Sequence, residues 1–326
     1  MSASDLRRLV EVAHLYYIGD FTQEKIASRM GVSRSKVSRM LKEARARGLV
    51  EIRVRSSLIT ESGLQERLGR ELGLKECLVL AAPDTIDAAE RVGALAGHYL
   101  RENIADESIV GVGWSNAVYH TVRSNSLEKK RDVTVAQLMG SVGDAIIELN
   151  GMYITGRLAD ALGARAHYIH APMIVTDAAV RDGLMRDPYI RKALTMARHA
   201  NIMLVGIGAI NENLGQYRAG YLDDADLEYI RERGAVGEVV GTYFSQEGDV
   251  VPLELNERII GLGFEDLTNI PIRVGVSWGV RKALANIGAA RRGLINVLIT
   301  DEDAAREMLD ILNGERSGLS PAGSEA

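Results

Sequence analysis

The chain has 326 residues, of which 46% are hydrophobic and 25% charged, and this composition is typical of a globular protein with room for one small and one large domain. No apolar run reaches the roughly 18–20 residues that a membrane-spanning helix needs. The N-terminus lacks an apolar signal core, and the single cysteine, Cys77, excludes an internal disulfide. We therefore expect a cytoplasmic protein that does not associate with a membrane.

The charge is distributed unevenly along the chain. Residues 1–55 contain 12 basic and 6 acidic side chains, whereas residues 56–326 contain 27 basic and 38 acidic ones, and the whole chain has a net charge of −5. A compact basic head on an acidic body indicates that the head binds a polyanion.

The sequence pattern of the basic head predicts three helices. Apolar residues recur at helical spacing over residues 6–18, and Gly19 ends this first helix. Thr22 is placed to cap the N-terminus of a second helix, and Gly31 permits the sharp turn after it. Ser33 is placed to cap a third helix, which ends at Gly48.

Two short helices joined by a Gly-containing turn are typical of a helix-turn-helix, whose second helix enters the major groove of DNA. The base-reading candidates lie on the exposed N-terminal half of that second helix: Ser33, Arg34, Ser35, Ser38 and Arg39. The side chains expected to contact phosphates are Thr22, Gln23, Lys36 and Lys42. The alternative is a solvated basic helix face. Residues 49–55 (LVEIRVR) alternate like a strand and would form a minimal wing.

The sequence pattern of the acidic body predicts an α/β fold. Residues 56–70 have the character of a linker running into a helix, after which short apolar runs alternate with amphipathic helices. The predicted strands are residues 77–80, 109–113, 134–139, 165–169, 202–207, 272–277 and 296–299. Such alternation favours a largely parallel sheet covered on both faces. The tail from 314 to 326 is expected to be disordered.

Ligands of open α/β sheets bind beyond the carboxyl ends of the strands, so the residues that follow each strand carry the functional information. Glycines with Ser and Asn follow several of them, in the segments GVGWSNAVYH, QLMGSVGD, GIGAINEN and SWGVRKALAN. Glycine lets backbone N–H groups approach a ligand, and a helix N-terminus favours an anion. Lys282 would supply the countercharge for a phosphate.

Signatures of enzymes and metal sites are absent from the sequence. It contains no GxxxxGK[ST], GxGxxG, GxSxG or HExxH motif. Of the six histidines only His167 and His170 are close in the chain, and on a strand this odd spacing would place them on opposite faces. We therefore predict no catalytic residue, no metal site and no cofactor.

The sequence resembles the SorC/DeoR-type family of bacterial sugar-responsive regulators. The matching segments are LYYIGDFTQEKIASRMGVSRSKVSRMLKEARARGLVEI in the head and, in the body, GVGWSNAV, VAQLMGSVGD, LADALGARAHYIHAPMIV, IMLVGIGAI, GAVGEVVGTYFSQEG and IPIRVGVSWGVRKALANIGAARRGLINVLITDEDAAREML. The resemblance implies a sugar-binding domain similar to glucosamine-6-phosphate deaminase and ribose-5-phosphate isomerase that has lost catalysis. It also implies a homotetramer that binds palindromic or tandem operators.

The resemblance further implies a set of effector-binding residues. The loop of Gly113, Trp114, Ser115 and Asn116 should hold an anionic or hydroxyl-rich group. Glu238 should accept hydrogen bonds from hydroxyl groups, and Lys282 should meet a phosphate. The remaining expected contacts are Gln137, Gly140, Ser141 and Gly208. The chain departs from the family pattern at Asn116 and at residues 277–279, so an unphosphorylated sugar or polyol remains an alternative to a sugar phosphate.

The resulting prediction is a transcriptional regulator of a carbohydrate catabolic operon, controlled by a sugar, polyol or sugar phosphate. Its predicted parts are a DNA-binding domain (1–55), a linker or oligomerisation segment (56–70), an effector domain (71–313) and the tail (314–326). One alternative is a sugar-phosphate isomerase or deaminase that uses Glu238, Asp144 and Lys282. A second alternative makes the body a dimerisation and partner-binding module without a small ligand.

Overall fold

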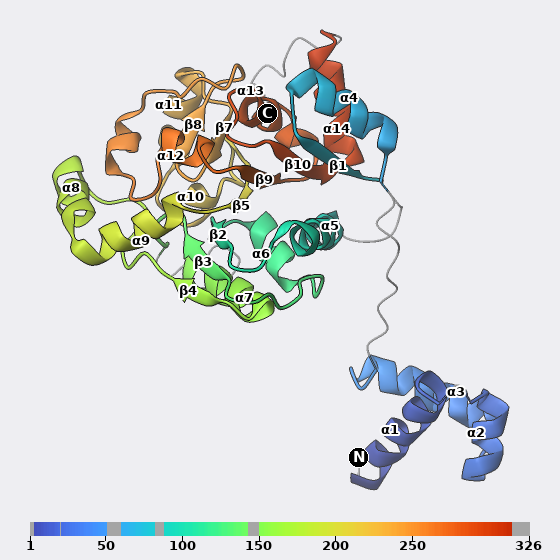
Figure 1. Ribbon diagram of the computed structural model, residues 1–326. Coiled ribbons are helices and arrows are strands. Elements are labelled where there is room, and N and C mark those ends of the chain that lie inside the picture. Colours follow the sequence, from blue (N-terminus) through green and yellow to red (C-terminus); the bar gives the residue numbers. More distant parts are fainter. Residues whose placement is uncertain (1–2, 20, 51–59, 82–87, 143–149, 315–326) are drawn as a thin grey trace. The chain divides into compact units, whose positions relative to one another are not determined.

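The computed structural model describes residues 3–19, 21–50, 60–81, 88–142 and 150–314 (Figure 1). The chain forms two compact units, Met1–Ser57 and Leu58–Ala326, and their boundary lies close to the predicted end of the basic head. The predicted wing from residue 51 onward, Gly143, Asp144 and the predicted tail from residue 315 onward lie outside the described residues.

The head unit contains three helices, α1 (Ala3–Tyr17), α2 (Gln23–Met30) and α3 (Arg34–Ala46). The Thr22 hydroxyl accepts a hydrogen bond from the backbone N–H of Lys25, and the Ser33 hydroxyl accepts one from Lys36, so both predicted N-caps are confirmed. Gly31 ends α2 with a φ of 63°, a left-handed conformation that glycine adopts without steric cost.

The three helices enclose a small apolar core. Val12 of α1 packs with Ile26 of α2 and with Val37 and Leu41 of α3, and all four side chains are buried. Of the apolar stripe on α1, Val12, Tyr16 and Tyr17 contact this core, Leu9 and Ala13 pack with Ala44 in a second small cluster, and Val10 is 49% exposed. The small core fixes the angle between α2 and α3, which is the structural requirement of a helix-turn-helix.

The body contains a seven-stranded parallel sheet in the order β1-β10-β9-β5-β2-β3-β4. Its strands are β1 (Glu76–Leu80), β2 (Ile109–Val112), β3 (Thr134–Gln137), β4 (Arg165–His167), β5 (Ile202–Gly206), β9 (Ile272–Val276) and β10 (Val297–Asp301). All seven coincide with the predicted strands, with ends shifted by a residue or two. The predicted parallel sheet is therefore confirmed.

Helices cover both faces of this sheet (Figure 1). One face is covered by α5 (Ala88–Asn103), α6 (Asn116–Arg123) and α7 (Gly151–Leu162), and the other by α4 (Ser62–Leu72), α9 (Pro188–Arg198), α13 (Ala283–Arg291) and α14 (Glu302–Leu312). The strands consist mainly of Val, Ile and Leu because both of their faces are buried. Leu68 and Leu72 of α4 are buried in this core, so α4 belongs to the body although its first residues were predicted as linker.

A second, three-stranded antiparallel sheet was not predicted. It consists of β6 (Gly208–Ala209), β7 (Gly237–Val239) and β8 (Thr242–Phe244) in that order. With α10 (Gly215–Arg218) and α11 (Asp224–Glu232) it surrounds a separate apolar cluster that includes Leu214, Leu227 and Tyr243. The remaining helices are α8 (Ala178–Arg186), α12 (Phe264–Thr268) and the 3₁₀ helices η2 (Glu254–Arg258) and η3 (Val280–Lys282).

The prediction that His167 and His170 lie on one strand was wrong. β4 ends at His167, and the ring of His170 instead lies 6.1 Å from that of Tyr168, measured between centroids.

The side on which the chain adds successive strands of the parallel sheet changes between β2 and β5. From β2 the chain adds β3 and β4 on one side, whereas from β5 it adds β9 and β10 on the other. Such a switch point leaves a crevice beyond the carboxyl ends of the two central strands, because the connections leave it in opposite directions.

Candidate functional site

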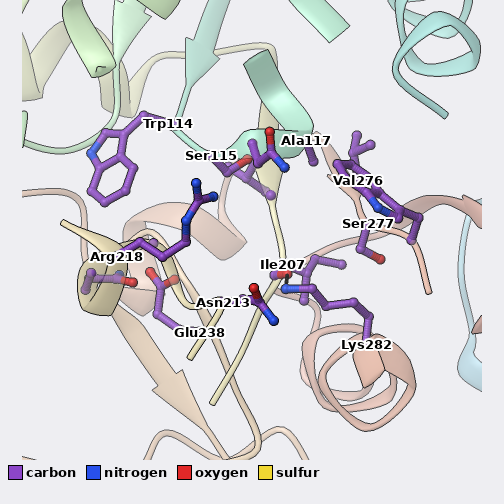
Figure 2. A pocket seen from close by; sticks show the side chains of 18 of the residues that line it. Trp114, Ser115, Ala117, Ile207, Asn213, Arg218, Glu238, Val276, Ser277 and Lys282 are labelled. Carbon is purple, nitrogen blue, oxygen red and sulfur yellow. Dashed lines mark hydrogen bonds between the residues drawn. The ribbon is translucent and has the colours of Figure 1, made fainter. Parts of the chain in front are cut away.

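A cavity of about 490 Å³ lies at this switch point (Figure 2). The ends of β2, β5 and β9 form one wall, and β7 with α10 forms the other. Seven of the ten predicted effector contacts line it: Gly113, Trp114, Ser115, Asn116, Gly208, Glu238 and Lys282.

The segment after β2 is held rigidly. Trp114 is buried, and its indole N–H donates to the carbonyl oxygen of Gly140 at 3.0 Å. The Ser115 hydroxyl caps α6 by accepting the N–H of Val118 at 3.1 Å. The indole N–H is thus occupied within the protein, whereas the Ser115 hydroxyl accepts one hydrogen bond and keeps its O–H as a donor. This segment offers a ligand an apolar ring face, that O–H, the Asn116 side chain and the start of a helix.

Two glycines create the space for this arrangement. A Cβ added at Gly206 would lie 2.1 Å from the Ser115 hydroxyl oxygen, and one added at Gly208 would lie 2.7 Å from Leu214 and 3.1 Å from a carboxylate oxygen of Glu238. A larger residue at Gly206, the end of β5, would therefore displace the cap of α6, and one at Gly208, the start of β6, would displace the opposite wall.

Glu238 is the only carboxylate that lines the cavity, as far as the structure describes the chain. It is buried on β7 and accepts hydrogen bonds from the N–H of Gly241 and the side chain of Gln216. Burial raises the pKa of the Glu238 carboxyl, and these two hydrogen bonds and the ammonium of Lys282 oppose that rise.

The Gly241 N–H reaches Glu238 because β7 and β8 are joined by a two-residue turn. Val240 and Gly241, its two central residues, have φ values of 52° and 78°, as in a type I′ hairpin turn. Val240 is buried and lines the cavity.

Lys282 enters the cavity from the segment after β9. Its ammonium donates to the carbonyl oxygen of Ile207 at 2.9 Å. Burial lowers the pKa of Lys282 to about 8, although the attraction of Glu238 opposes this change. The segment is anchored by Asp301, whose two carboxylate oxygens accept the N–H of Gly279 at 3.0 and 3.1 Å.

The rim of the cavity carries further side chains that were not among the predicted effector contacts. Arg281 of η3 forms an ion pair of 2.6 Å with Glu212, which joins the two walls. The amide side chains of Asn211 and Asn213, together with Arg218 of α10, line the wall opposite the main sheet. Asn211 and Asn213 belong to the segment GIGAINEN that follows a predicted strand, whereas Arg218 lies beyond that segment and no predicted strand marks it.

The other three predicted contacts do not line the cavity. Gln137 is buried, and its amide nitrogen donates to the Ser141 hydroxyl at 2.8 Å while its oxygen accepts the N–H of Ile169 at 3.2 Å. A Cβ at Gly140 would meet the carbonyl oxygen of Pro172 at 2.4 Å. In the structure the Gly140 carbonyl oxygen accepts the hydrogen bond of Trp114, and Gln137 and Ser141 accept backbone N–H groups of the segment after β4. These three residues therefore hold the cavity wall in place without lining it.

The predicted DNA-contacting residues gather on one part of the head. Arg34, Ser35, Lys36, Arg39 and Lys42 are exposed along α3, and Ser38 is half-buried. Thr22 is exposed and Gln23 is half-buried at the start of α2. The hydroxyls of Thr22 and Ser33 accept backbone N–H groups as helix caps.

No group of three or more His, Cys, Asp or Glu side chains suited to a metal ion exists among the described residues. Nor does any helix in the described part of the chain have the length and apolar character needed to cross a bilayer.

Both units match known protein families. A family profile described as "Putative sugar-binding domain" matches residues 56–310, and a Crp-like helix-turn-helix domain matches residues 6–67. The chain is 28% identical over 305 residues to the deoxyribonucleoside regulator of Bacillus subtilis, covering 93% of this chain and 97% of that one. It is 29% identical over 306 residues to the transcriptional regulator LsrR of Escherichia coli K12, covering 93% of this chain and 94% of LsrR.

Solved structures agree with these matches. The full-length sorbitol operon regulator SorC from Klebsiella pneumoniae has the same fold, with a TM-score of 0.74, 24% identity, and coverage of 94% of this chain and 100% of that one. A DeoR family transcriptional regulator from Listeria monocytogenes matches with a TM-score of 0.70 at 25% identity, over 76% of this chain and 98% of that one. The predicted likeness to the deaminase and the isomerase stays a prediction. The sugar-binding profile spans more than half of the chain, which therefore belongs to the SorC/DeoR-type family of sugar-responsive transcriptional regulators and is not an enzyme.

Proposed function

We propose that the chain regulates a carbohydrate catabolic operon by binding operator DNA through α2 and α3, and that a sugar, polyol or sugar phosphate in the switch-point cavity changes its affinity for that DNA. The observation that carries this proposal is the cavity itself, which brings together apolar walls, amide side chains, the buried Glu238 and the half-buried Lys282 beyond the carboxyl ends of the central strands. Carboxylate and amide groups bind the hydroxyl groups of a polyol by hydrogen bonds.

The head contributes the DNA contacts. Bases in the major groove are read by Ser33, Arg34, Ser35, Ser38 and Arg39, and phosphates are bound by Thr22, Gln23, Lys36 and Lys42. The protein acts in the cytoplasm as a homotetramer on palindromic or tandem operators. When one assembly carries several heads, its affinity for DNA depends on the distance between them, because linked heads bind two DNA sites at once only when their spacing matches that of the sites.

The effector acts by binding the two arrangements of the heads with different affinity, since a ligand with equal affinity for both would shift nothing. The residues of the cavity proposed to contact it are Gly113, Trp114, Ser115, Asn116, Gly208, Glu238 and Lys282.

Fluorescence anisotropy of the full-length chain on DNA from its own upstream region tests the proposal. The titration is made at fixed salt, because phosphate contacts make the affinity depend steeply on ionic strength. It is repeated with pooled sugars, polyols and sugar phosphates. We expect one compound to shift the binding curve, and the direction of the shift tells whether the effector releases the DNA or engages it. Specific DNA binding that no compound shifts would refute the sugar-responsive mechanism, and absence of specific binding would refute the regulator.

A further inference from the structure

We propose that α8 and the adjoining Tyr189 form a contact surface for a second copy of this chain, related to the first by a two-fold axis. This inference rests on the proposed function and assigns one interface of the homotetramer proposed there. Figure 1 shows α8 at the margin of the body, next to α9. The surface therefore lies apart from the cavity and from the helix-turn-helix.

The helix α8 buries none of its nine residues within the described chain. A helix of this length is not stable in water by itself and depends on the packing of an apolar face. The Asp177 carboxylate caps α8 by accepting the N–H of Val180 at 2.9 Å, and Leu184 and Met185 are half-buried against the main core. A partner over the outer face would supply burial that this helix lacks in a single chain.

The outer face of α8 is partly apolar and open to close approach. Val180 is 43% exposed, and Tyr189 in the first turn of α9 is 83% exposed. Tyrosine is enriched in protein–protein interfaces, where its ring covers a large area at little entropic cost. Gly183 is exposed in the middle of α8, and a Cβ added there would meet nothing within 4 Å. Glycine weakens the middle of a helix, but it lets another molecule approach the backbone closely.

The charges of this face complement a second copy of the same helix. Asp182 and Arg186 are both exposed and stand four residues apart, on one side of α8. Arg186 forms no ion pair with any residue that the structure describes. Asp182 is paired with Arg181 at 2.8 Å, and its carboxylate has room for another donor.

A two-fold axis uses such a pair of charges twice. In a symmetric interface a residue of one protomer meets a second position of its partner, and the reverse contact forms as well. An axis that crosses α8 between the two charged positions brings Arg186 to the partner subunit's Asp182, and Asp182 to the partner subunit's Arg186. One cation and one anion on the same face therefore favour a second copy of this chain over an unrelated protein.

Sedimentation velocity of the full-length chain over a range of concentrations tests the assignment. We expect the unmodified chain to sediment as an assembly. Val180→Glu should raise the dissociation constant of one association step at least about 10-fold, because association would desolvate a carboxylate against apolar groups. Val250→Glu changes the same kind of side chain at a position 40% exposed outside α8 and α9, and should sediment like the unmodified chain. Far-ultraviolet circular dichroism verifies that both variants keep their helix content.

Charge reversal tests the two-fold arrangement. Arg186→Glu would set carboxylates against each other at both symmetric contacts, and Asp182→Arg would do the same with guanidinium groups, so each variant alone should associate at least about 10-fold more weakly. An equimolar mixture of the two variants pairs a carboxylate with a guanidinium at both contacts and should recover the association of the unmodified chain. Effects within one helix cannot produce this recovery, because each chain in the mixture keeps its own substitution.

Three results would overturn the assignment: an unmodified chain that is monomeric at every concentration, Val180→Glu that assembles as tightly as Val250→Glu, and a mixture that associates no more tightly than its components. Operator binding and its response to the pooled compounds are measured on the same samples. If the unmodified chain binds its operator and responds while one of these results is obtained, the α8 interface fails and the regulatory function stands.

Discussion

Replacement of Lys282 by methionine should change how the stability of the body depends on pH. Burial lowers the pKa of Lys282 from 10.5 to about 8. At about 1.4 kcal/mol for each pKa unit, this difference corresponds to roughly 3 kcal/mol. Below pH 8 the ammonium is charged in the folded and the unfolded chain, and the folded chain bears the whole cost of desolvating it.

Between pH 8 and 10.5 the folded chain releases this proton while the unfolded chain still holds it. Because the unfolded state then binds more protons, the contribution of Lys282 to the free energy of unfolding rises with pH through this window. Lys282→Met lacks the titrating group and should lack this rise.

Urea unfolding at a series of pH values from about 7 to 10.5 measures the effect. Both tryptophans of the chain, Trp114 and Trp278, lie in the body, so their fluorescence follows the unfolding of that unit. Over the window the free energy of unfolding of the unmodified chain should rise by roughly 3 kcal/mol relative to that of Lys282→Met. Lys192→Met, at an exposed position of α9, is the control and should show a level difference. A level difference for Lys282→Met too would mean that the folded chain does not desolvate this ammonium, and would refute the reasoning.

Three further changes test other parts of the structure. Arg39→Ala should weaken operator binding by about 1–3 kcal/mol if the guanidinium contacts a guanine, and equal losses on specific and non-specific DNA in anisotropy titrations would contradict base reading. Ser33→Ala removes the hydrogen bond to the Lys36 N–H and should destabilise the head by about 1 kcal/mol, visible as a lower midpoint of its thermal unfolding in far-ultraviolet circular dichroism. Gly206→Ala places a methyl group against the hydroxyl of Ser115 and should abolish the effector response while DNA binding persists; an unchanged dose–response curve would show that the cavity tolerates it.

The sequence predicted those parts of the fold whose signals are local. The seven strands of the parallel sheet are buried on both faces and appear as apolar runs, and the caps Thr22 and Ser33 stand directly before helical patterns. The strands β6, β7 and β8 have only two or three residues each, too few for an alternating pattern. Their hairpin turn carries Val-Gly in place of the Asn-Gly or Asp-Gly that would have marked it.

The site was predictable where it follows a predicted strand, and at Glu238, which lies on the unpredicted β7, through the family resemblance alone. The residues after β2 and β9 were found in this way, whereas Arg218 enters the cavity from a short helix of the second apolar cluster. Gln137 stands at the carboxyl end of β3, yet hydrogen bonds to Ser141 and Ile169 use both ends of its amide. Position along a strand therefore identifies candidates, and the partners of each polar atom decide which of them can bind a ligand.

The turn at Val240 limits how stable the body can become. A β-branched residue with a positive φ is uncommon, and holding it there costs of the order of 1–3 kcal/mol. Asparagine or glycine would relieve that cost, but would replace an apolar contact in the cavity wall by an amide or by empty space. At this position the body cannot gain stability without changing the surface that it offers to a ligand, and so its folded state is held below the stability that the same backbone could reach.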